Sequence, residues 1–247
     1  MIQFDFQDQT ALVTGASRGI GEQIARDLLA CGAKVIVTAP KQDAESALHH
    51  EFGTSVSSLV VDFSDGESTQ NFLHEIDSQE RIDVCVNNAG VLITGPITEI
   101  PESDWDMVHA INLKAPFLVT QAVAKLMKQN GYGRVVNIAS IWDQITMPGR
   151  AAYASSKSGL RGLTRTSAVD LIKDGILVNA VSPGFTLTKI LRDSRSPDQL
   201  QELAKSIPLG RLAETTEISH AALFLASRLN TYITGQTLTI DGGYSIV

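Results

Sequence analysis

Three polar side chains in the second half of the sequence have the types and spacing that acid–base chemistry on a carbonyl group requires. Tyr153 and Lys157 lie four residues apart in a stretch with a helical pattern, so they share one face of the helix. A neighbouring ammonium favours the phenolate, and we therefore expect the pKa of Tyr153 to be lowered towards neutrality, where a general acid–base works best. Ser140 ends an apolar run upstream, and its hydroxyl could hold the same carbonyl oxygen. Each feature alone is also typical of ordinary packing or of a turn.

A glycine-rich turn near the N-terminus could approach a phosphate group. Gly15, Gly19 and Gly21 follow a short β-branched run with the spacing Gly-x3-Gly-x-Gly. Glycine lets the backbone turn sharply, and a helix that begins near Gly19 would point free N–H groups at an anion. The spacing differs from the Gly-x-Gly-x-x-Gly of the commonest dinucleotide motif, so a tight strand-to-helix turn without a ligand is the alternative.

The residues after the second apolar run bear on the choice between two nicotinamide cofactors. An acidic residue about 20 residues after the glycine turn would hold the ribose 2′-hydroxyl of NAD. The sequence at that place reads Thr38-Ala39-Pro40-Lys41 and has no carboxylate. Arg18 and Lys41 could instead attract a 2′-phosphate. We therefore expect NADP(H) to be favoured over NAD(H).

The segments that must position these residues alternate between strand and helix patterns. Short β-branched runs predict strands at Thr10–Thr14, Lys34–Thr38, Ser57–Val61, Ile82–Val86, Arg134–Ala139, Ile176–Val181 and Gln236–Ile240. Amphipathic stretches predict helices at Ile20–Ala30, Asp43–Phe52, Glu67–Asp77, Glu102–Asn130, Ala151–Asp174 and Thr215–Ser227. This alternation predicts an α/β fold: a single Rossmann-type, doubly wound domain over residues 1–247, with a seven-stranded, mostly parallel sheet and helices on both faces.

Such a sheet would bring the three groups of residues together. Ligands bind beyond the carboxyl ends of parallel strands, which is where the glycine turn, Ser140 and the start of the Tyr153 helix would converge. The polar stretch 185–212, which contains two prolines, is the least regular part of the chain. We expect it to form a flexible lid over the substrate, with an ordinary surface insertion as the alternative.

Composition favours a folded, soluble protein and argues against several classes of partner. The 247 residues are 43% hydrophobic and carry a net charge of −7, which disfavours general nucleic-acid binding. The acidic N-terminus does not resemble a signal peptide, and no run reaches the ~18 apolar residues of a membrane helix. Cys31 and Cys85 are expected to be buried, inert thiols in a cytoplasmic protein. The five histidines have no metal-ligand spacing, so no metal site is expected.

Taken together, these motifs resemble those of the short-chain dehydrogenase/reductase family. The matching pieces span nearly the whole chain: Thr14-Gly15-x3-Gly19-x-Gly21, Asn87-Asn88-Ala89-Gly90, Asn112, Ser140, Tyr153-x3-Lys157, Pro183-Gly184 and Asp241-Gly242-Gly243. The resemblance implies a catalytic set of Ser140, Tyr153 and Lys157, with Asn112 bending its helix and holding a water in a proton relay. It also implies a homotetramer with the two long predicted helices at one interface. The cofactor-binding residues that it and the turn imply are Gly15, Ser17, Arg18, Gly19, Ile20, Gly21, Asp62, Phe63, Asn88, Ala89, Gly90, Tyr153, Lys157, Pro183, Gly184, Thr186 and Thr188.

Within the family, the sequence is most similar to 3-oxoacyl-[acyl-carrier-protein] reductases. Those enzymes meet an acidic carrier protein through basic residues, but the corresponding places read Gln129-Asn130 and Lys173-Asp174 here. Trp142 stands where that group has small residues, and we interpret it either as a wall of the substrate pocket or as a core aromatic. Three cations of the lid could meet an anionic substrate, or they could be a solvated helix face: Lys189, Arg192 and Arg195.

The sequence therefore predicts an NADP(H)-dependent oxidoreductase that reduces a carbonyl or oxidises a secondary alcohol, with a small molecule as substrate. Three alternatives stay open. Two are enzymes, a 3-oxoacyl-[acyl-carrier-protein] reductase of fatty-acid synthesis and an NAD-dependent alcohol dehydrogenase. The third is a regulator that binds the cofactor without turnover, although the intact Ser140, Tyr153 and Lys157 argue against it.

Overall fold

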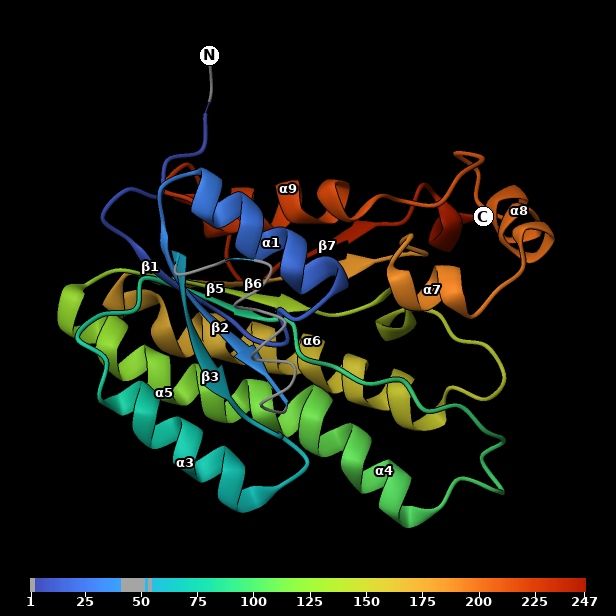
Figure 1. Cartoon of the computed structure of the whole chain (residues 1–247), viewed down its shortest axis with the longest axis horizontal. Coiled ribbons are helices and arrows are strands. Elements are labelled where there is room, and N and C mark those ends of the chain that lie inside the picture. Colours follow the sequence, from blue (N-terminus) through green and yellow to red (C-terminus); the bar gives the residue numbers. More distant parts are fainter. Residues whose placement is uncertain (1–2, 41–51, 53–54) are drawn as a thin grey trace.

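A seven-stranded sheet forms the centre of the computed structural model, which describes residues 3–40, 52 and 55–247 (Figure 1). The strand order is β3-β2-β1-β4-β5-β6-β7, and every neighbouring pair is parallel. This order confirms the predicted doubly wound, Rossmann-type sheet, although the sheet is wholly rather than mostly parallel in the described part. The strands are β1 (Thr10–Val13), β2 (Lys34–Ala39), β3 (Val56–Val60), β4 (Val84–Asn87), β5 (Gly133–Ile138), β6 (Ile176–Pro183) and β7 (Thr237–Ile240).

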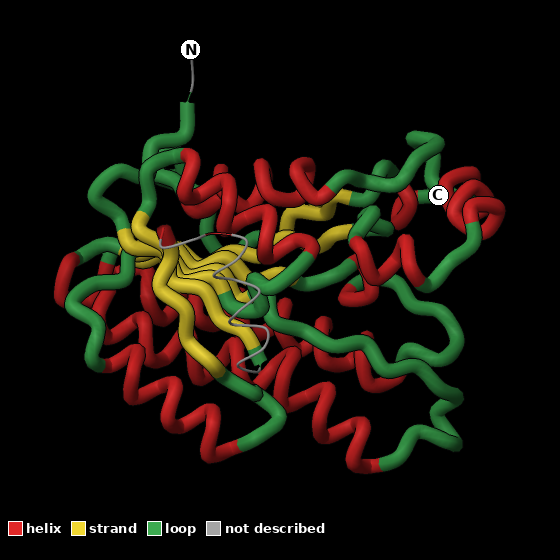
Figure 2. Tube along the Cα trace, in the orientation of Figure 1, coloured by secondary structure: helices red, strands yellow, loops and turns green. Residues whose placement is uncertain are grey.

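Helices cover both faces of the sheet (Figures 1 and 2). One layer holds α1 (Gly19–Ala30) and α9 (Thr215–Ala226), and the other holds α3 (Gly66–Asp77), α5 (Ala115–Asn130) and α6 (Ala151–Leu171). The remaining helical segments are α4 (Glu102–His109), η2 (Ala110–Lys114), η3 (Ile141–Asp143), η4 (Ile172–Asp174), α7 (Lys189–Asp193), α8 (Pro197–Lys205) and η5 (Tyr244–Ile246).

Strand side chains alternate between the two helix layers. In β1, Ala11 and Val13 pack in the cluster that contains Ile24 of α1. Leu12, between them, packs in the opposite cluster with Phe72 of α3. Because both faces are covered, the central strands contain few polar residues, which is why their runs are almost continuously apolar in the sequence.

The predicted helix Glu102–Asn130 is interrupted in its middle. A single π-helical turn, η2, separates α4 from α5, and Asn112 lies fully buried within it. The Asn112 amide pairs with both backbone groups of Val91, with two hydrogen bonds of 2.9 Å. Its Nδ2 also donates to Ser156 Oγ at 3.1 Å. The turn therefore ties this helix to the loop after β4 and to α6.

The segment 185–212, expected to be the least regular part of the chain, contains two short helices, α7 and α8 (Figure 1). Each helix begins with a side-chain cap. Thr188 accepts from the Leu191 N–H, and Ser196 forms a capping box with Gln199.

The two ends of the 185–212 segment are joined by backbone pairing. Thr186 and Ala213 form a parallel β-bridge, with hydrogen bonds from Leu187 N to the Ala213 carbonyl (2.8 Å) and from Ala213 N to the Phe185 carbonyl (3.0 Å). The segment that contains α7 and α8 is thus a long loop whose two ends are joined by backbone hydrogen bonds.

Two earlier predictions, the helix Asp43–Phe52 and the cationic role of Lys41, lie outside the described residues except for Phe52. The remaining predicted strands and helices occur with small shifts of their ends. Among the helices of the described part, none combines the length and apolar character that a membrane crossing needs.

Candidate active site

The glycine turn after β1 leaves room for an anion. Gly15 and Gly19 have φ angles of 65° and 67°, a left-handed conformation that side chains other than glycine rarely adopt. The residue before α1, Arg18, makes no side-chain cap, so the first N–H groups of α1 are not capped by that residue. Together they form a cradle of the kind that holds a pyrophosphate at a helix N-terminus.

Side chains from neighbouring strands fix the shape of this turn. The Asn88 amide after β4 donates to the carbonyls of Thr14 (3.0 Å) and Gly15 (2.9 Å). The Thr14 hydroxyl accepts from the N–H groups of Asn88 and Ala89, both at 3.0 Å. Thr38 at the end of β2 accepts from the Gly15 N–H at 3.0 Å. The turn is therefore held by three strands before any ligand arrives.

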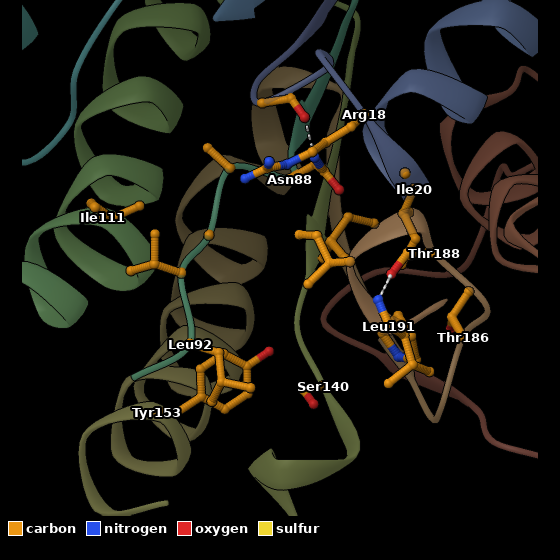
Figure 3. A pocket seen from close by; sticks show the side chains of 18 of the residues that line it. Arg18, Ile20, Asn88, Leu92, Ile111, Ser140, Tyr153, Thr186, Thr188 and Leu191 are labelled. Atoms are coloured by element: carbon orange, nitrogen blue, oxygen red, sulfur yellow. Dashed lines mark hydrogen bonds between the residues drawn. The ribbon is translucent and has the colours of Figure 1, made fainter. Parts of the chain in front are cut away.

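Ser140, Tyr153 and Lys157 meet beyond the end of β5. Ser140 lies two residues after the end of this strand, and the other two lie in the first two turns of α6. Tyr153 and Ser140 face each other at one end of the pocket, and Arg18 lies at the other end (Figure 3). Lys157 is 3% exposed, and its Nζ donates to the Ile138 carbonyl at 2.8 Å and lies 5.7 Å from the centroid of the Tyr153 ring.

One cavity of about 590 Å³ connects the glycine turn to these three residues. Of the predicted site residues, Asn112 and Gly21 lie behind its wall. Gly21 is buried, and a Cβ there would collide with the Asn88 amide and with the Gly15 carbonyl, so it permits close packing of α1. The cavity wall includes Gly15, Ser17, Arg18, Gly19, Ile20, Asp62, Phe63, Asn88, Ala89, Gly90, Ser140, Tyr153, Lys157, Pro183, Gly184, Thr186 and Thr188.

The arrangement matches that of known proteins. The family model described as enoyl-(acyl carrier protein) reductase matches residues 15–245. The 3-oxoacyl-[acyl-carrier-protein] reductase of Rickettsia bellii is 37% identical, with 98% of this chain and 99% of the relative covered. The chain belongs to the short-chain dehydrogenase/reductase family.

Other relatives of this short-chain dehydrogenase/reductase are named for a different substrate, gluconate. The gluconate 5-dehydrogenase of Gluconobacter oxydans is 33% identical over 98% of this chain and 97% of its own length. The structure of a gluconate 5-dehydrogenase from Burkholderia cenocepacia in complex with NADP and tartrate has a TM-score of 0.91 and 31% identity, and covers 99% of this chain and 98% of that one. Family members act on CH–OH and carbonyl groups with NAD(P), and this chain is an oxidoreductase of that type.

The net effect of the surrounding protein groups is to raise the pKa of Tyr153. Burial raises the pKa of the phenol, and a hydrogen bond with Ser140 and the charge of Arg150 oppose that effect only in part. Among the protein's own groups, nearby positive charge does not outweigh burial, because removing a phenolate from water costs more than these contacts return. Lys157 interacts with the aromatic ring and a backbone carbonyl instead.

A buried carboxylate, Asp143, lies three residues after Ser140. Asp143 Oδ2 accepts from the Ser182 hydroxyl at 2.7 Å, and Oδ1 lies 4.0 Å from Arg161. Burial raises the pKa of Asp143. Burial also lowers the pKa of Lys157 to about 8, against the opposing charge of Asp143. The lysine thus stays largely protonated at neutral pH.

Several wall residues were not recognised as site residues from the sequence. Thr38 and Arg150 carry no motif of their own and enter the wall through the fold. Trp142 is buried and also lines the cavity, and two of the three cations singled out in the 185–212 segment, Lys189 and Arg195, line it too. The third, Arg192, lies outside the wall and faces Glu214 at 3.9 Å.

The two cysteines lie outside the cavity wall. Cys85 is fully buried, which raises its pKa to about 12, and Cys31 is partly buried with a raised pKa. Over residues 3–40, 52 and 55–247, no three His, Cys, Asp or Glu side chains form a cluster that could hold a metal ion.

Proposed function

We propose that the protein is an NADP(H)-dependent oxidoreductase that reduces a carbonyl group, or oxidises a secondary alcohol, with Tyr153 as general acid–base. One observation carries the proposal: a single cavity has an anion-binding turn at one end and Ser140, Tyr153 and Lys157 at the other. The cradle of Gly15 and Gly19 fits a pyrophosphate. Ser140 and Tyr153 suit the chemistry of a carbonyl or hydroxyl group, because one can hydrogen-bond its oxygen and the other can transfer a proton to or from it.

The chain's own residues divide the chemistry between them. When bound, the nicotinamide supplies a hydride to the substrate carbon in reduction and accepts it in oxidation. Tyr153 donates its proton to the substrate oxygen in reduction and takes it back in oxidation. Ser140 donates a hydrogen bond to that oxygen and stabilises negative charge on it. Lys157 lies against the Tyr153 ring and helps to orient it, and Asn112 holds the loop at Val91 and joins a proton relay through water.

The functional test is a screen for NADPH oxidation with keto acids, sugars, acyl thioesters, steroids, quinones and small ketones. At least one class should be reduced by the wild type. Tyr153→Phe should lose nearly all turnover of that class. Tight NADPH binding without reduction of any class would favour the non-catalytic regulator.

Preference for NADP(H) is supported by charges near the adenosine end of the cavity. Ala39 and Pro40 line the wall where an acid would select NAD. Among the described wall residues the one carboxylate is Asp62, which accepts hydrogen bonds from the N–H (2.9 Å) and hydroxyl (2.6 Å) of Ser64. Arg18 is exposed, lines the cavity and is available to a 2′-phosphate.

Arg18→Ala should weaken NADPH binding and leave NADH binding nearly unchanged. Loss of one charge-assisted hydrogen bond, about 1.4 kcal/mol, corresponds to a roughly tenfold rise in Kd for NADPH. Fluorescence titration of wild type and variant with both cofactors measures this, and NADH serves as the internal control. Tighter binding of NADH than NADPH by the wild type would overturn the proposed preference and favour the NAD-dependent alcohol dehydrogenase.

The carrier-protein role remains a second candidate because the Rickettsia bellii relative is named for it. Against it, positive charge on the surface near α5 is offset: Lys128 Nζ pairs with Asp174 at 2.9 Å. Preferential reduction of 3-oxoacyl thioesters in the screen would support this role.

We also propose that the 185–212 segment acts as a lid over the substrate and that the enzyme works in the cytoplasm. Six residues from Thr188 to Arg195 line the cavity, while the pairing at Ala213 fixes the base of the segment. Both cysteines are free thiols, as suits a reducing compartment.

The protein should assemble as a homotetramer through α4, α5 and α6. These helices expose large apolar side chains, including Trp105, Met107, Phe117 and Val169, the last 75% exposed. Apolar side chains grouped on one face mark an interface. Light scattering after gel filtration should give four times the chain mass of 26.5 kDa, and Phe117→Asp should lower it. A monomer at all protein concentrations would contradict the assembly.

A further inference from the structure

The cavity is more basic than the protein around it. The chain has a net charge of −7. Dinucleotide phosphates account for positive charge beside the glycine turn, but this turn is remote from Ser140 and Tyr153 (Figure 3). Within the described ranges, the wall has one acidic side chain, Asp62, and five basic ones, namely Arg18, Arg150, Lys157, Lys189 and Arg195.

Arg150 is held close to the Tyr153 hydroxyl. It directly precedes α6, and its carbonyl accepts a hydrogen bond from the Ala154 N–H at 2.7 Å, so its side chain starts about one helical turn from Tyr153. Burial raises the pKa of the phenol, and the positive charge of Arg150 opposes this, as expected of a guanidinium near the phenol. Arg150 therefore lies at the reacting end of the cavity.

The guanidinium of Arg150 also lies near a cluster of three aromatic rings. The guanidinium carbon of Arg150 lies 5.9 Å from the centroid of the Trp142 ring, within cation–π range. Trp142 packs edge-on against Phe185 (6.1 Å) and Tyr244 (6.5 Å), and those two rings lie 5.1 Å apart. Rings from three distant parts of the chain thus build a rigid wall that limits the orientations of the guanidinium.

The Arg150 side chain has no protein acceptor among the described residues. Its Nε is buried without a hydrogen-bond partner, and no carboxylate forms an ion pair with it. The nearby buried acid, Asp143, is engaged by Ser182 and Arg161 instead. A buried N–H without an acceptor is costly, so a ligand that supplies one gains binding energy.

We infer that Arg150 binds the carboxylate of the substrate and makes this enzyme selective for hydroxy acids and their oxo acids. This inference rests on the proposed carbonyl chemistry and names its substrate class. A guanidinium presents parallel N–H groups that match the two oxygens of a carboxylate, which a neutral ester or alcohol cannot reproduce. A substrate held at its acid group by Arg150 would have its carbonyl beside Ser140 and Tyr153.

Substrate pairs with and without the acid group test this directly. The probes are acetoacetate with methyl acetoacetate, levulinate with methyl levulinate, and 5-ketogluconate with L-sorbose, in which a CH2OH group replaces the carboxylate. We expect wild type to prefer the acid of at least one pair. Arg150→Met should lower kcat/KM for that acid about 10- to 100-fold, mainly through KM, and change the neutral partner less than about threefold. Arg150→Lys should lie between the two.

Two controls separate this inference from folding defects and from failure of the proposed function. Arg165→Met removes an exposed cation from the same helix outside the cavity wall and should leave the acid preference intact. If no probe is turned over, calorimetry with the same acids and neutral partners on the NADP⁺ complex supplies the readout. Acid-selective binding that Arg150→Met abolishes supports the inference. Equal loss for acids and neutral partners, or no acid preference in wild type, overturns it.

Discussion

Replacing Tyr153 with Phe should reduce kcat by about 10³-fold or more while the protein still folds and binds NADPH. A positioned general acid–base contributes roughly 10²- to 10⁴-fold to a rate, and the phenol is the group that reaches the substrate oxygen opposite Ser140. NADPH affinity should change less than about fivefold, since one neutral hydrogen bond contributes about 1 kcal/mol. Steady-state kinetics and fluorescence titration of NADPH measure the two effects separately.

Tyr132→Phe is a matched control for this substitution. The Tyr132 hydroxyl is buried without a hydrogen-bond partner, and its ring packs under Arg134 at 4.4 Å, just before β5 and outside the cavity wall. Its removal should leave kcat unchanged. Turnover by Tyr153→Phe within tenfold of wild type would rule out the phenol as the proton donor, whatever the substrate.

The second large effect is expected from Gly15→Ala in the anion cradle. A Cβ at residue 15 would lie 2.8 Å from Ala89 Cα and 3.1 Å from Ala89 N, and the φ angle of 65° adds strain for alanine. The turn would have to move away from the loop after β4, which also lines the cavity. Kd for NADPH should rise at least about 100-fold, the effect of roughly 2.7 kcal/mol of lost interactions.

The same change should lower stability. Strain of roughly 2 kcal/mol corresponds to a fall in Tm of roughly 4–8 °C for a chain of this size. Gly66→Ala at the exposed start of α3 is the control, because a Cβ there meets no atom within 4 Å. Differential scanning calorimetry and NADPH titration of both variants give the comparison. Normal NADPH affinity in Gly15→Ala would show that this turn does not hold the cofactor.

Local patterns were enough to predict the sheet and to select Ser140, Tyr153 and Lys157, which the fold brings onto one cavity wall. Continuous apolar runs reflect strands covered on both faces, and the four-residue spacing of Tyr153 and Lys157 is a property of one helix. The caps Thr188 and Ser196 were also visible in the sequence, with Ser196 followed three residues later by Gln199. They would have predicted the two helices of the 185–212 segment.

Features that depend on distant contacts could not be predicted in this way. The π turn at Asn112 is compensated by Val91, 21 residues away in the chain. The effect of burial on the pKa of Tyr153 was missed, because a sequence shows which charges are nearby but not how much water folding removes. Arg150 acquires its significance only when Trp142 and Tyr153 are seen beside it.

The bridge between Thr186 and Ala213 has an evolutionary consequence. Because the backbone closes there, the spacing of the two chain ends is set independently of the residues between them. Mutation, insertion or deletion between Lys189 and Lys205 can alter the side chains that this segment presents to the cavity while the backbone pairing at Thr186 and Ala213 is kept. Diversification of specificity and retention of the redox machinery are thereby uncoupled within one polypeptide.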